Sequence, residues 1–428
     1  MTITRKVPKT SGYRLFIAEV VRAINKPAES DTLALLDGRA GKLCFDLLPS
    51  KTVRAMGAFF TPSPMAAKVV AHLLKIDASK MVAFDPACGA GDLLLPLAAL
   101  LPVARTASGT MRIWNEHLFG RDLSPEFVRA ARLRLLLLAL NRGVRLDGTP
   151  ASVANILSNI VAGDGLSDMR PYRSATHIVM NPPFGIVKTP KATEWRQGSV
   201  TAAALFVDRA LEWCSPKTRI AAILPEVLRT GTSYRQWRER VASRSAASRV
   251  MSLGLFSTNA DVDVFLTRLI VQKARPKRAV KGPGNRSSTV RISDKFSVTV
   301  GPVVPHRHGL KGPPRAFLHA GNATAWKTIK RINDSRRFNG KLHKPPFVVI
   351  RRTSRPGDYN RAIASLVLGT RPVAVENHLL VARPLRGGIP LCQELVRLLR
   401  SRAVNRTLDR TMRCRHLTTL CVSRLTWV

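Results

Sequence analysis

Short apolar runs alternate with helix-like segments across residues 81–272, and this alternation most constrains the fold. The expected strands are Met81–Phe84, His117–Gly120, Ile156–Ala162, His177–Met180, Arg219–Leu224, Leu253–Phe256 and Val264–Gln272. The expected helices are Leu93–Leu101, Glu126–Leu140, Phe206–Trp213 and Ser233–Ser243. Strands that alternate with helices at this spacing predict an open, doubly wound α/β sheet. Such sheets bind ligands beyond the carboxyl ends of their strands, so the strand-end loops are where a site is expected.

The first strand-end loop, Asp85–Asp92, reads DPACGAGD and leads from a strand into a helix. Glycine lets the backbone approach a ligand closely, and an acid at a strand end can anchor a hydroxyl or an ammonium group. A pyrophosphate loop has the form G-x-G-x-x-G without acids, so this loop favours a cationic or neutral cofactor over a dinucleotide. A glycine turn that only lets the helix pack on the strand is the alternative interpretation.

Two further acids follow expected strands. Asp122 comes just after the second strand, where an acid typically accepts hydrogen bonds from ribose hydroxyls. It is equally suited to capping the helix that begins near Pro125. Asp164, in the sequence Gly163-Asp164-Gly165, ends the third strand and taken alone is more typical of a turn than of a ligand.

The fourth loop, Asn181-Pro182-Pro183-Phe184, follows the apolar run Ile178–Met180. Two prolines stiffen the backbone and remove two amide donors, which leaves carbonyl oxygens and the Asn181 amide as acceptors beside an aromatic ring. That combination suits a planar amine, because the acceptors bind its NH₂ group and the ring stacks on its face. Its position at a strand end, shortly after Asp164, strengthens the interpretation.

The order of these motifs resembles that of the adenine-N6 DNA methyltransferases. The sequence Gly57-Ala58-Phe59-Phe60-Thr61-Pro62 lies upstream of the glycine loop, as in the gamma arrangement of that family, where the target recognition domain comes last. The resemblance covers residues 55–273 and implies a Rossmann-like methyltransferase sheet. A weaker likeness over Phe347–Arg424 is to the C-terminal recognition regions of type II and related restriction–modification methyltransferases; a generic basic α/β domain is the alternative there.

The resemblance implies S-adenosyl-L-methionine as cofactor and adenine N6 in double-stranded DNA as acceptor. The implied cofactor-binding residues are Phe59, Thr61, Pro62, Asp85, Ala87, Gly89, Gly91, Asp122 and Asp164. The implied catalytic residues are Asn181, Pro182, Pro183 and Phe184. Phe184 is expected to stack on one face of a flipped-out adenine, and Phe256 on the other. No metal is implied, and the pair His306-x-His308 lacks further ligands at a suitable spacing.

Charge separates the chain into two parts. The full sequence has a formal net charge of +42, and residues 275–428 hold 32 Lys and Arg against six Asp and Glu. Such an excess predicts a polyanionic partner, most plausibly DNA. The expected domains are a helical cap at 1–50 (helices Tyr13–Asn25 and Thr32–Leu35), a catalytic domain at 51–274, a Pro/Gly/Lys/Arg-rich linker at 275–300 and a basic DNA target recognition domain at 301–428.

Other features of the sequence bear on where the protein is located and on which activities it has. Six cysteines without any CxxC pair suit reduced thiols in a bacterial cytoplasm, near the nucleoid. The longest apolar run, Leu135–Leu140, is too short to span a bilayer, so no membrane association is expected. The run Arg129–Arg142 is expected to form a helix with one buried face and a solvated basic face. No nuclease constellation is recognisable, so any restriction activity is expected in a separate endonuclease subunit.

Three functions stay open on the sequence. The leading one is a DNA adenine-N6 methyltransferase, acting as the modification component of a restriction–modification system. The first alternative is an RNA or protein N-methyltransferase that shares the Asn-Pro-Pro-Phe loop; the basic C-terminal part and the Phe-Thr-Pro sequence count against it. The second is a catalytically silent DNA-binding subunit; the intact Asp85, Gly89, Asn181 and Phe184 count against that.

Overall fold

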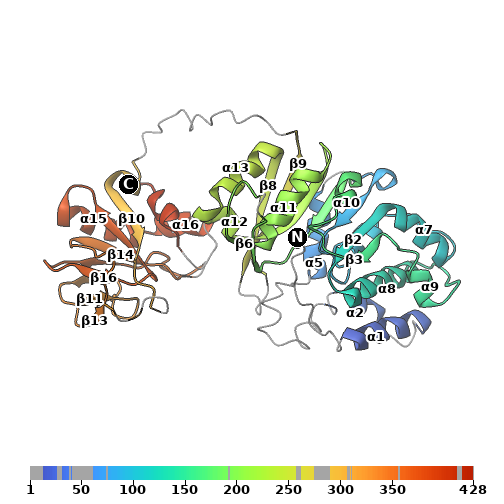
Figure 1. The fold of residues 1–428 in the computed structure, drawn as a ribbon, viewed down its shortest axis with the longest axis horizontal. Helices are drawn as coiled ribbons and strands as arrows, with labels where there is room; N and C mark the ends of the chain where they lie inside the picture. The colour runs from blue at the N-terminus through green and yellow to red at the C-terminus, as the bar shows by residue number, and fades with distance from the viewer. Residues whose placement is uncertain are drawn as a thin grey trace. The chain divides into compact units, whose positions relative to one another are not determined.

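The computed structural model shows two compact units, one formed by residues 1–228 and 235–278 and one by residues 229–234 and 279–428 (Figure 1). The structure describes residues 13–26, 31–37, 40, 61–73, 76–190, 193–256, 262–273, 290–305, 309, 311–354, 357–411 and 417–427. Residues 290–300, which the sequence analysis assigns to the linker, contain helix α14 (Ile292–Lys295) and strand β10 (Phe296–Val300) of the second unit.

A seven-stranded sheet in the order β3-β2-β1-β4-β7-β9-β8 forms the centre of the first unit. The strands are β1 (Ala83–Asp85), β2 (Leu118–Asp122), β3 (Ile160–Ala162), β4 (His177–Met180), β7 (Arg219–Pro225), β8 (Ser245–Leu255) and β9 (Asp263–Val271). Neighbours from β3 to β7 are parallel, and β9 runs antiparallel to both β7 and β8. The first strand, β1, lies inside the sheet; β2 and β3 are added on one side of it, and β4 and the later strands on the other. This reversal between β1 and β4 confirms the doubly wound α/β sheet.

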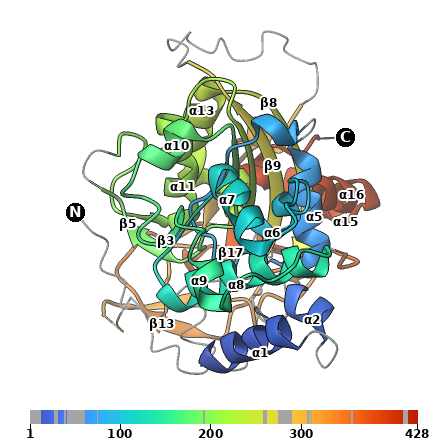
Figure 2. The same cartoon turned by 90° about the vertical axis from the view of Figure 1, so that its right-hand side faces the viewer.

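Two groups of helices cover this sheet. The first group, in which each helix contacts the next, is α5 (Ser63–His72), α6 (Leu94–Ala98), α8 (Pro125–Asn141) and α7 (Ala107–His117). The second is α10 (Arg170–Ser174), α11 (Ala202–Trp213) and α13 (Arg235–Arg244). In Figure 2, α10, α11 and α13 lie to one side of strands β8 and β9, and α5 lies to the other. Two helices near the N-terminus, α1 (Tyr13–Asn25) and α2 (Thr32–Leu36), pack on α8, as does α9 (Pro150–Ala154).

Most elements expected from the sequence are present within a few residues of the expected ends. Strand β3 is shorter than expected because α9 and a turn occupy residues up to 159. Strand β8 is longer and begins at Ser245. Helix α7 was not expected, because its residues are mostly polar and include Gly109; it is capped by the Thr106 side chain, which accepts a hydrogen bond from the Gly109 amide.

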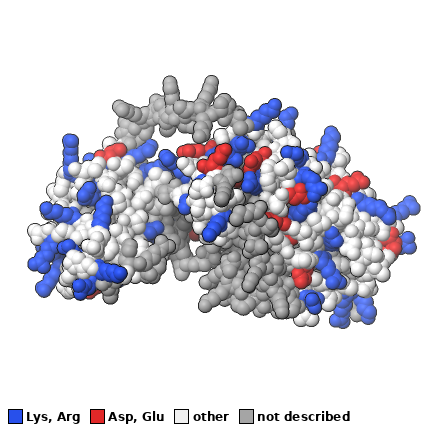
Figure 3. Space-filling model, viewed as in Figure 1, with Lys and Arg blue, Asp and Glu red and all other residues white. Residues whose placement is uncertain are grey.

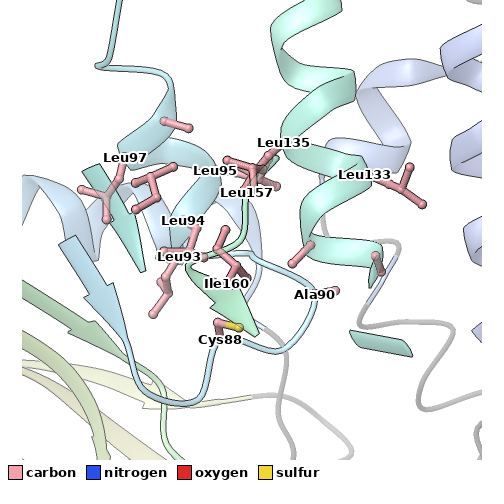
Figure 4. Close-up of a cluster of buried hydrophobic side chains, with 14 of the residues drawn as sticks. Cys88, Ala90, Leu93, Leu94, Leu95, Leu97, Leu133, Leu135, Leu157 and Ile160 are labelled. Atoms are coloured by element: carbon pink, nitrogen blue, oxygen red, sulfur yellow. The ribbon is translucent and has the colours of Figure 1, made fainter. Parts of the chain in front are cut away.

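An apolar core lies directly beneath the glycine loop. Figure 4 shows Cys88 and Ala90 of that loop beside leucines of α6 and α8. Leu94, Leu97 and Leu135 have no exposed surface. Complete burial of a leucine contributes roughly 1.5–3 kcal/mol, so this core holds the loop on a rigid base.

The second unit is a three-layered α/β body. Its five-stranded sheet, in the order β10-β17-β14-β15-β12, contains β12 (Thr328–Ile329), β14 (Phe347–Arg351), β15 (Ala364–Val367) and β17 (Leu379–Pro384) besides β10. Alternate residues of β14 face opposite layers: Val348 and Ile350 pack in the cluster containing helices α15 (Gly388–Arg400), α16 (Arg402–Thr411) and α17 (Thr419–Ser423). Phe347 and Val349 pack towards a three-stranded sheet of β13 (Ser335–Arg337), β11 (Pro314–Leu318) and β16 (Val373–Val375).

Candidate functional site

Four polar residues follow neighbouring strands at the carboxyl edge of the seven-stranded sheet. Asp164 follows β3, Asp122 ends β2, Asp85 ends β1 and Asn181 follows β4. Because the strand order is β3-β2-β1-β4, these residues form a row along one edge. The point between β1 and β4, where the winding changes direction, is where open α/β sheets bind ligands. The fold therefore brings the acids of the sequence motifs to the same edge as the Asn-Pro-Pro-Phe loop.

Hydrogen bonds join the glycine loop to the end of β2. The Gly89 amide donates to Asp122 Oδ2 over 3.0 Å, and the Cys88 amide donates to the Arg121 carbonyl over 2.8 Å. Gly89 has φ 51°, in the left-handed region that glycine adopts without strain. Asp122 Oδ1 also accepts from the Ser124 amide over 2.9 Å at the start of α8. Asp122 therefore holds the glycine loop and the turn before α8, whereas the N-cap of that helix is Ser124, whose hydroxyl accepts from the Phe127 amide over 3.3 Å.

Burial perturbs both acids at the centre of the row. Burial, together with the negative charges of Asp122 and Asp92, raises the pKa of Asp85 to about 8, against one hydrogen bond from the Ala87 amide. Burial likewise raises the pKa of Asp122 to about 6, against the amides of Ser124 and Gly89. Acids whose pKa values are raised by burial at the strand edge are typical of ligand-binding and catalytic sites.

The third loop packs against the first through a glycine that the sequence analysis did not single out. A Cβ atom on Gly165 would lie 1.9 Å from the Pro86 carbonyl oxygen, so only glycine fits there. The Tyr172 hydroxyl donates to the Gly165 carbonyl over 2.9 Å. Asp164, next to this glycine, accepts the Leu166 amide over 2.9 Å. The close approach fixes Asp164 relative to the loop that carries Asp85.

The Asn-Pro-Pro-Phe loop is tied to the segment that precedes α5. Asn181, 9% exposed, donates from Nδ2 to Thr61 Oγ1 over 3.0 Å. The Thr61 amide in turn donates to Asp92 Oδ2 over 3.1 Å. The far end of the loop is held by Thr201, the residue before α11, whose hydroxyl donates to the Phe184 carbonyl over 2.9 Å. The loop is therefore fixed at both ends.

The rings of Phe184 and Phe256 contact each other edge to face. Their centroids are 5.9 Å apart and their planes meet at 86°. Phe256 is 5% exposed and Phe184 is half-buried against the core of the first unit. Two rings that enclose a base lie parallel, one against each face of the base, whereas the planes of Phe184 and Phe256 meet at 86°. One of the two rings must move before they can enclose a base.

A buried ion pair, missed by the sequence analysis, supports the loop from below. Arg134 on α8 has no exposed surface and donates to Asp92 Oδ1 over 2.8 Å. Its other donors reach the carbonyls of Ala90 at 2.6 Å and of Leu35 and Leu36 at 3.0 Å each. The expectation that the basic side chains of this helix are solvated is wrong for Arg134. Its apolar neighbours on both sides in the sequence were the available signal.

The remaining site residues of the sequence analysis take varied places. Pro62 is exposed and precedes α5, and Phe59 lies outside the described residues. Gly91 has φ 88° and faces Ala131 of α8. A Cβ atom on Gly91 would lie 3.2 Å from the Ala131 Cβ atom, so the glycine allows α8 to pack closely against the loop. Leu123, 37% exposed beside Asp122, is an apolar surface at the row that the sequence analysis overlooked.

Metal-binding and membrane-spanning features are absent from the parts of the chain that the structure describes. Within those residues no group of three or more His, Cys, Asp or Glu side chains is placed to hold a metal ion. His306 and His308 lie outside them. Among the described helices, none has the length and hydrophobicity to cross a membrane.

A parallel-rich sheet with one reversed strand, a glycine loop after β1 and acids after β1, β2 and β3 defines the class of Rossmann-like methyltransferases. More narrowly, the chain belongs to the N-6 DNA methylase family, whose sequence profile matches residues 46–281, more than half of the chain. A comparison with curated protein sequences finds no match.

Solved structures extend this comparison. The chain is similar to the type IIL restriction–modification enzyme MmeI, solved in complex with DNA, with a TM-score of 0.54, 14% identity, and coverage of 91% of this chain and 69% of MmeI. It also matches the M protein of the type I restriction enzyme EcoKI (TM-score 0.38, 16% identity, 61% of this chain, 67% of that one). A third match is a modification subunit of a type I restriction enzyme from Vibrio vulnificus YJ016, with a TM-score of 0.38 and 19% identity over 54% of this chain. The chain spans about half, 48%, of that subunit's length.

Proposed function

We propose that this protein transfers a methyl group from S-adenosyl-L-methionine to N6 of an adenine in DNA, at a specific sequence. The observation that carries the proposal is the row Asp164, Asp122, Asp85 and Asn181 at the switch point, with Asn181 held by Thr61 at 3.0 Å. Membership of the N-6 DNA methylase family supports both the reaction class and the acceptor.

The residues of the row fit this cofactor in their chemistry. Asp85 and Asp122 are partly neutral in the absence of a cation and become favourable partners for one. Asp122 is placed to accept the ribose hydroxyls, as an acid after the second strand does in nucleotide-binding sheets. Leu123 offers apolar surface to the adenine ring, and Asp164 an acceptor for its amine. Phe59, Thr61, Pro62, Ala87, Gly89 and Gly91 remain proposed contacts of the same group. When bound, the cofactor supplies an activated methyl group.

Asn181 and Pro182 are proposed to prepare the acceptor nitrogen. The N6 lone pair of adenine is delocalised into the ring, which makes the nitrogen a poor nucleophile. Accepting its two hydrogens on Asn181 Oδ1 and the Pro182 carbonyl draws the nitrogen towards tetrahedral geometry and localises the lone pair. The bond from Asn181 Nδ2 to Thr61 sets the orientation of the amide for this role. The remaining catalytic effect is positioning and electrostatic stabilisation.

Adenine N6 is inaccessible to chemistry inside a stacked duplex, so the target base must be flipped out. We propose that Phe184 stacks on one face of the flipped base and that Phe256 moves from its edge-to-face contact to cover the other. Pro183 keeps the backbone before Phe184 rigid. The edge-to-face pair then fills the base site until DNA arrives.

The second unit is proposed to bind the DNA and select the sequence. Its Lys and Arg side chains far outnumber its acids, also on the face seen in Figure 3. MmeI, which shares the fold over most of this chain, was solved in complex with DNA. We infer a modification role in a restriction–modification system, with any nuclease in a separate subunit, and a cytoplasmic location beside the chromosome.

One experiment tests the proposal against its alternatives. The purified protein is incubated with S-adenosyl-L-methionine labelled in its methyl group and with separate DNA, RNA and protein acceptors, and Asn181→Ala is the matched variant. Label in DNA as N6-methyladenine, lost in Asn181→Ala, is the expected result. Label in RNA or protein alone contradicts the DNA assignment, and no transfer to any acceptor favours a silent DNA-binding subunit. Sequencing methylated DNA then gives the recognised site.

A further inference from the structure

A short hairpin emerges directly from the Asn-Pro-Pro-Phe loop. It consists of β5 (Ile186–Lys188) and β6 (Ser199–Thr201), paired antiparallel with Ile186 opposite Thr201 and Lys188 opposite Ser199. The Ala202 amide donates to the Gly185 carbonyl over 2.8 Å, which binds the base of the hairpin to the start of α11. Together with the Thr201–Phe184 bond, this contact makes the hairpin and the loop one rigid piece.

The outer face of the hairpin has an unusual composition. Side chains alternate between the two faces of a strand, and Val187 faces inward while Ile186 and Lys188 are exposed. An outward position at the end of a two-stranded hairpin is ordinarily polar, yet the side chain of Ile186 is 68% exposed. A single exposed apolar residue is common on proteins. This one is distinguished by its place, because Ile186 lies two residues beyond Phe184, at most about 7 Å along the chain.

The far end of the hairpin is also fixed, by contacts with the rest of the first unit. The Thr189 amide donates to the Gly198 carbonyl over 2.8 Å, closing the loop that follows β5. Trp195 in that loop is 4% exposed. Glu194 of the same loop lies 3.3 Å from Arg240 on α13, which also pairs with the buried Asp208 of α11. These contacts hold the backbone of the hairpin in place, so Ile186 can insert into a binding partner without displacement of the hairpin.

We propose that Ile186 is a wedge that enters the DNA stack beside the flipped adenine, and that Lys188 binds a flanking phosphate. The inference rests on the proposed function. Flipping leaves a gap in the stack, and apolar side chains, Ile among them, are groups that proteins insert between base steps. Burial of Ile186 against base faces offsets part of the cost of unstacking, while the cation of Lys188 on the same face is attracted to the backbone. The wedge thereby favours the flipped state that Phe184 receives.

The test uses full-length protein and duplex oligonucleotides that carry the recognised site. Ile186→Ala is compared with Leu15→Ala on α1, since Leu15 has the same 68% exposure and the change removes the same number of carbons. Single-turnover methylation is measured on a matched duplex and on one with an abasic site opposite the target adenine. We expect Ile186→Ala to slow methylation of the matched duplex by on the order of ten-fold, and of the abasic duplex by less than about two-fold. Leu15→Ala is expected to leave both rates unchanged.

The two substrates separate a wedge from a structural effect. An abasic partner lowers the work of flipping, so a residue that helps flipping becomes dispensable, whereas a damaged active site stays slow on both duplexes. Equal slowing on both, or a rate for Ile186→Ala equal to that of Leu15→Ala on the matched duplex, overturns the wedge. Lys188→Gln is expected to reduce the salt dependence of DNA binding by about one phosphate contact, and an unchanged dependence overturns its assignment. Wild-type protein that methylates no duplex overturns the proposed function itself, a result distinct from all of these.

Discussion

Asn181 and Thr61, 120 positions apart in the sequence, share a hydrogen bond of 3.0 Å between Nδ2 and Oγ1. Thr61 is 3% exposed and its amide is bound to Asp92, so its hydroxyl is held at a fixed point. The proposed catalytic amide is therefore oriented by a residue from a segment that lies outside the Asn-Pro-Pro-Phe loop. Under the proposed function, this contact gives Thr61 a role in orienting Asn181 towards the acceptor, beside its proposed role in cofactor binding.

Replacing Thr61 by Val tests that link. Valine has nearly the same shape but no hydroxyl, so the Asn181 amide loses this acceptor at a cost of about 1–3 kcal/mol. We expect the single-turnover methylation rate to fall about ten-fold or more, with a smaller change in cofactor affinity measured by calorimetry. Thr61→Ser keeps the hydroxyl and is the control, with a rate near that of the wild type. An unchanged rate in Thr61→Val contradicts the orienting role.

The buried pair of Arg134 and Asp92 predicts a large effect on stability. Arg134→Met removes one charge of a buried pair and leaves the Asp92 carboxylate without its cation, which typically costs about 3–5 kcal/mol. Denaturant unfolding followed by circular dichroism measures the change. Arg129→Met, an exposed arginine on the same helix, is the control and is expected to change stability by less than about 0.5 kcal/mol. Similar stabilities for the two variants would show that the pair contributes little.

The raised pKa values of Asp85 and Asp122 predict how cofactor binding depends on pH. Bound cationic and hydroxyl groups favour the ionised carboxylates, so affinity for S-adenosyl-L-methionine is expected to rise as pH increases through about 6 and about 8, and to level off above. Binding near pH 7 should release protons, which calorimetry in buffers of different ionisation enthalpy detects. Asp122→Asn should abolish the rise near pH 6. The stability of the cofactor-free protein is expected to change with pH in the opposite direction. The raised pKa values of Asp85 and Asp122 contribute stability that is fully present below about pH 4 and is lost as pH rises through about 6 and about 8.

Two glycines of the third loop provide a matched pair of substitutions. Gly165→Ala places a Cβ 1.9 Å from the Pro86 carbonyl oxygen, so the two loops must separate and we expect cofactor affinity to fall more than ten-fold. Gly163→Ala, two residues earlier, meets nothing closer than the Arg121 Cδ atom at 3.6 Å and is expected to bind the cofactor normally. Isothermal titration of both variants decides the matter. Normal binding by Gly165→Ala would mean that the loop contact does not shape the site.

The sequence predicts those parts of the site whose cause is local. Asp85 and Asp122 are found because an acid directly follows an apolar strand, and the Asn-Pro-Pro-Phe loop because four adjacent residues carry its chemistry. The Asp92–Arg134 pair spans 42 positions, and Gly165 is required by a carbonyl on another loop. Neither cause leaves a local pattern, since each depends on which segments the sheet order brings together. The leucines on both sides of Arg134 indicate burial, but an arginine is so seldom buried that the sequence predicts a solvated basic face for this helix.

Helix α16 carries a stripe of arginines that we expect to bind the DNA backbone. Arg402, Arg406 and Arg410 are exposed and recur every fourth residue, which puts them about 6 Å apart along one side of the helix. The opposite side is buried through Val404 and Leu408. The helix is further anchored because Asp409 pairs with the buried Arg361 at 2.8 Å. A rigid row of three cations suits successive phosphates.

Replacing the three arginines by Gln is expected to weaken DNA binding uniformly across sequences and to lower the slope of log affinity against log salt by about two to three. Fluorescence anisotropy over a range of salt concentrations measures it. The control replaces Arg105, Arg112 and Arg145, exposed arginines of the first unit, and removes the same net charge. If the slope falls equally in both triple variants, net charge alone governs the affinity. If it falls only in the α16 variant, this helix contacts the DNA backbone, because counterion release reflects only the phosphates that are neutralised.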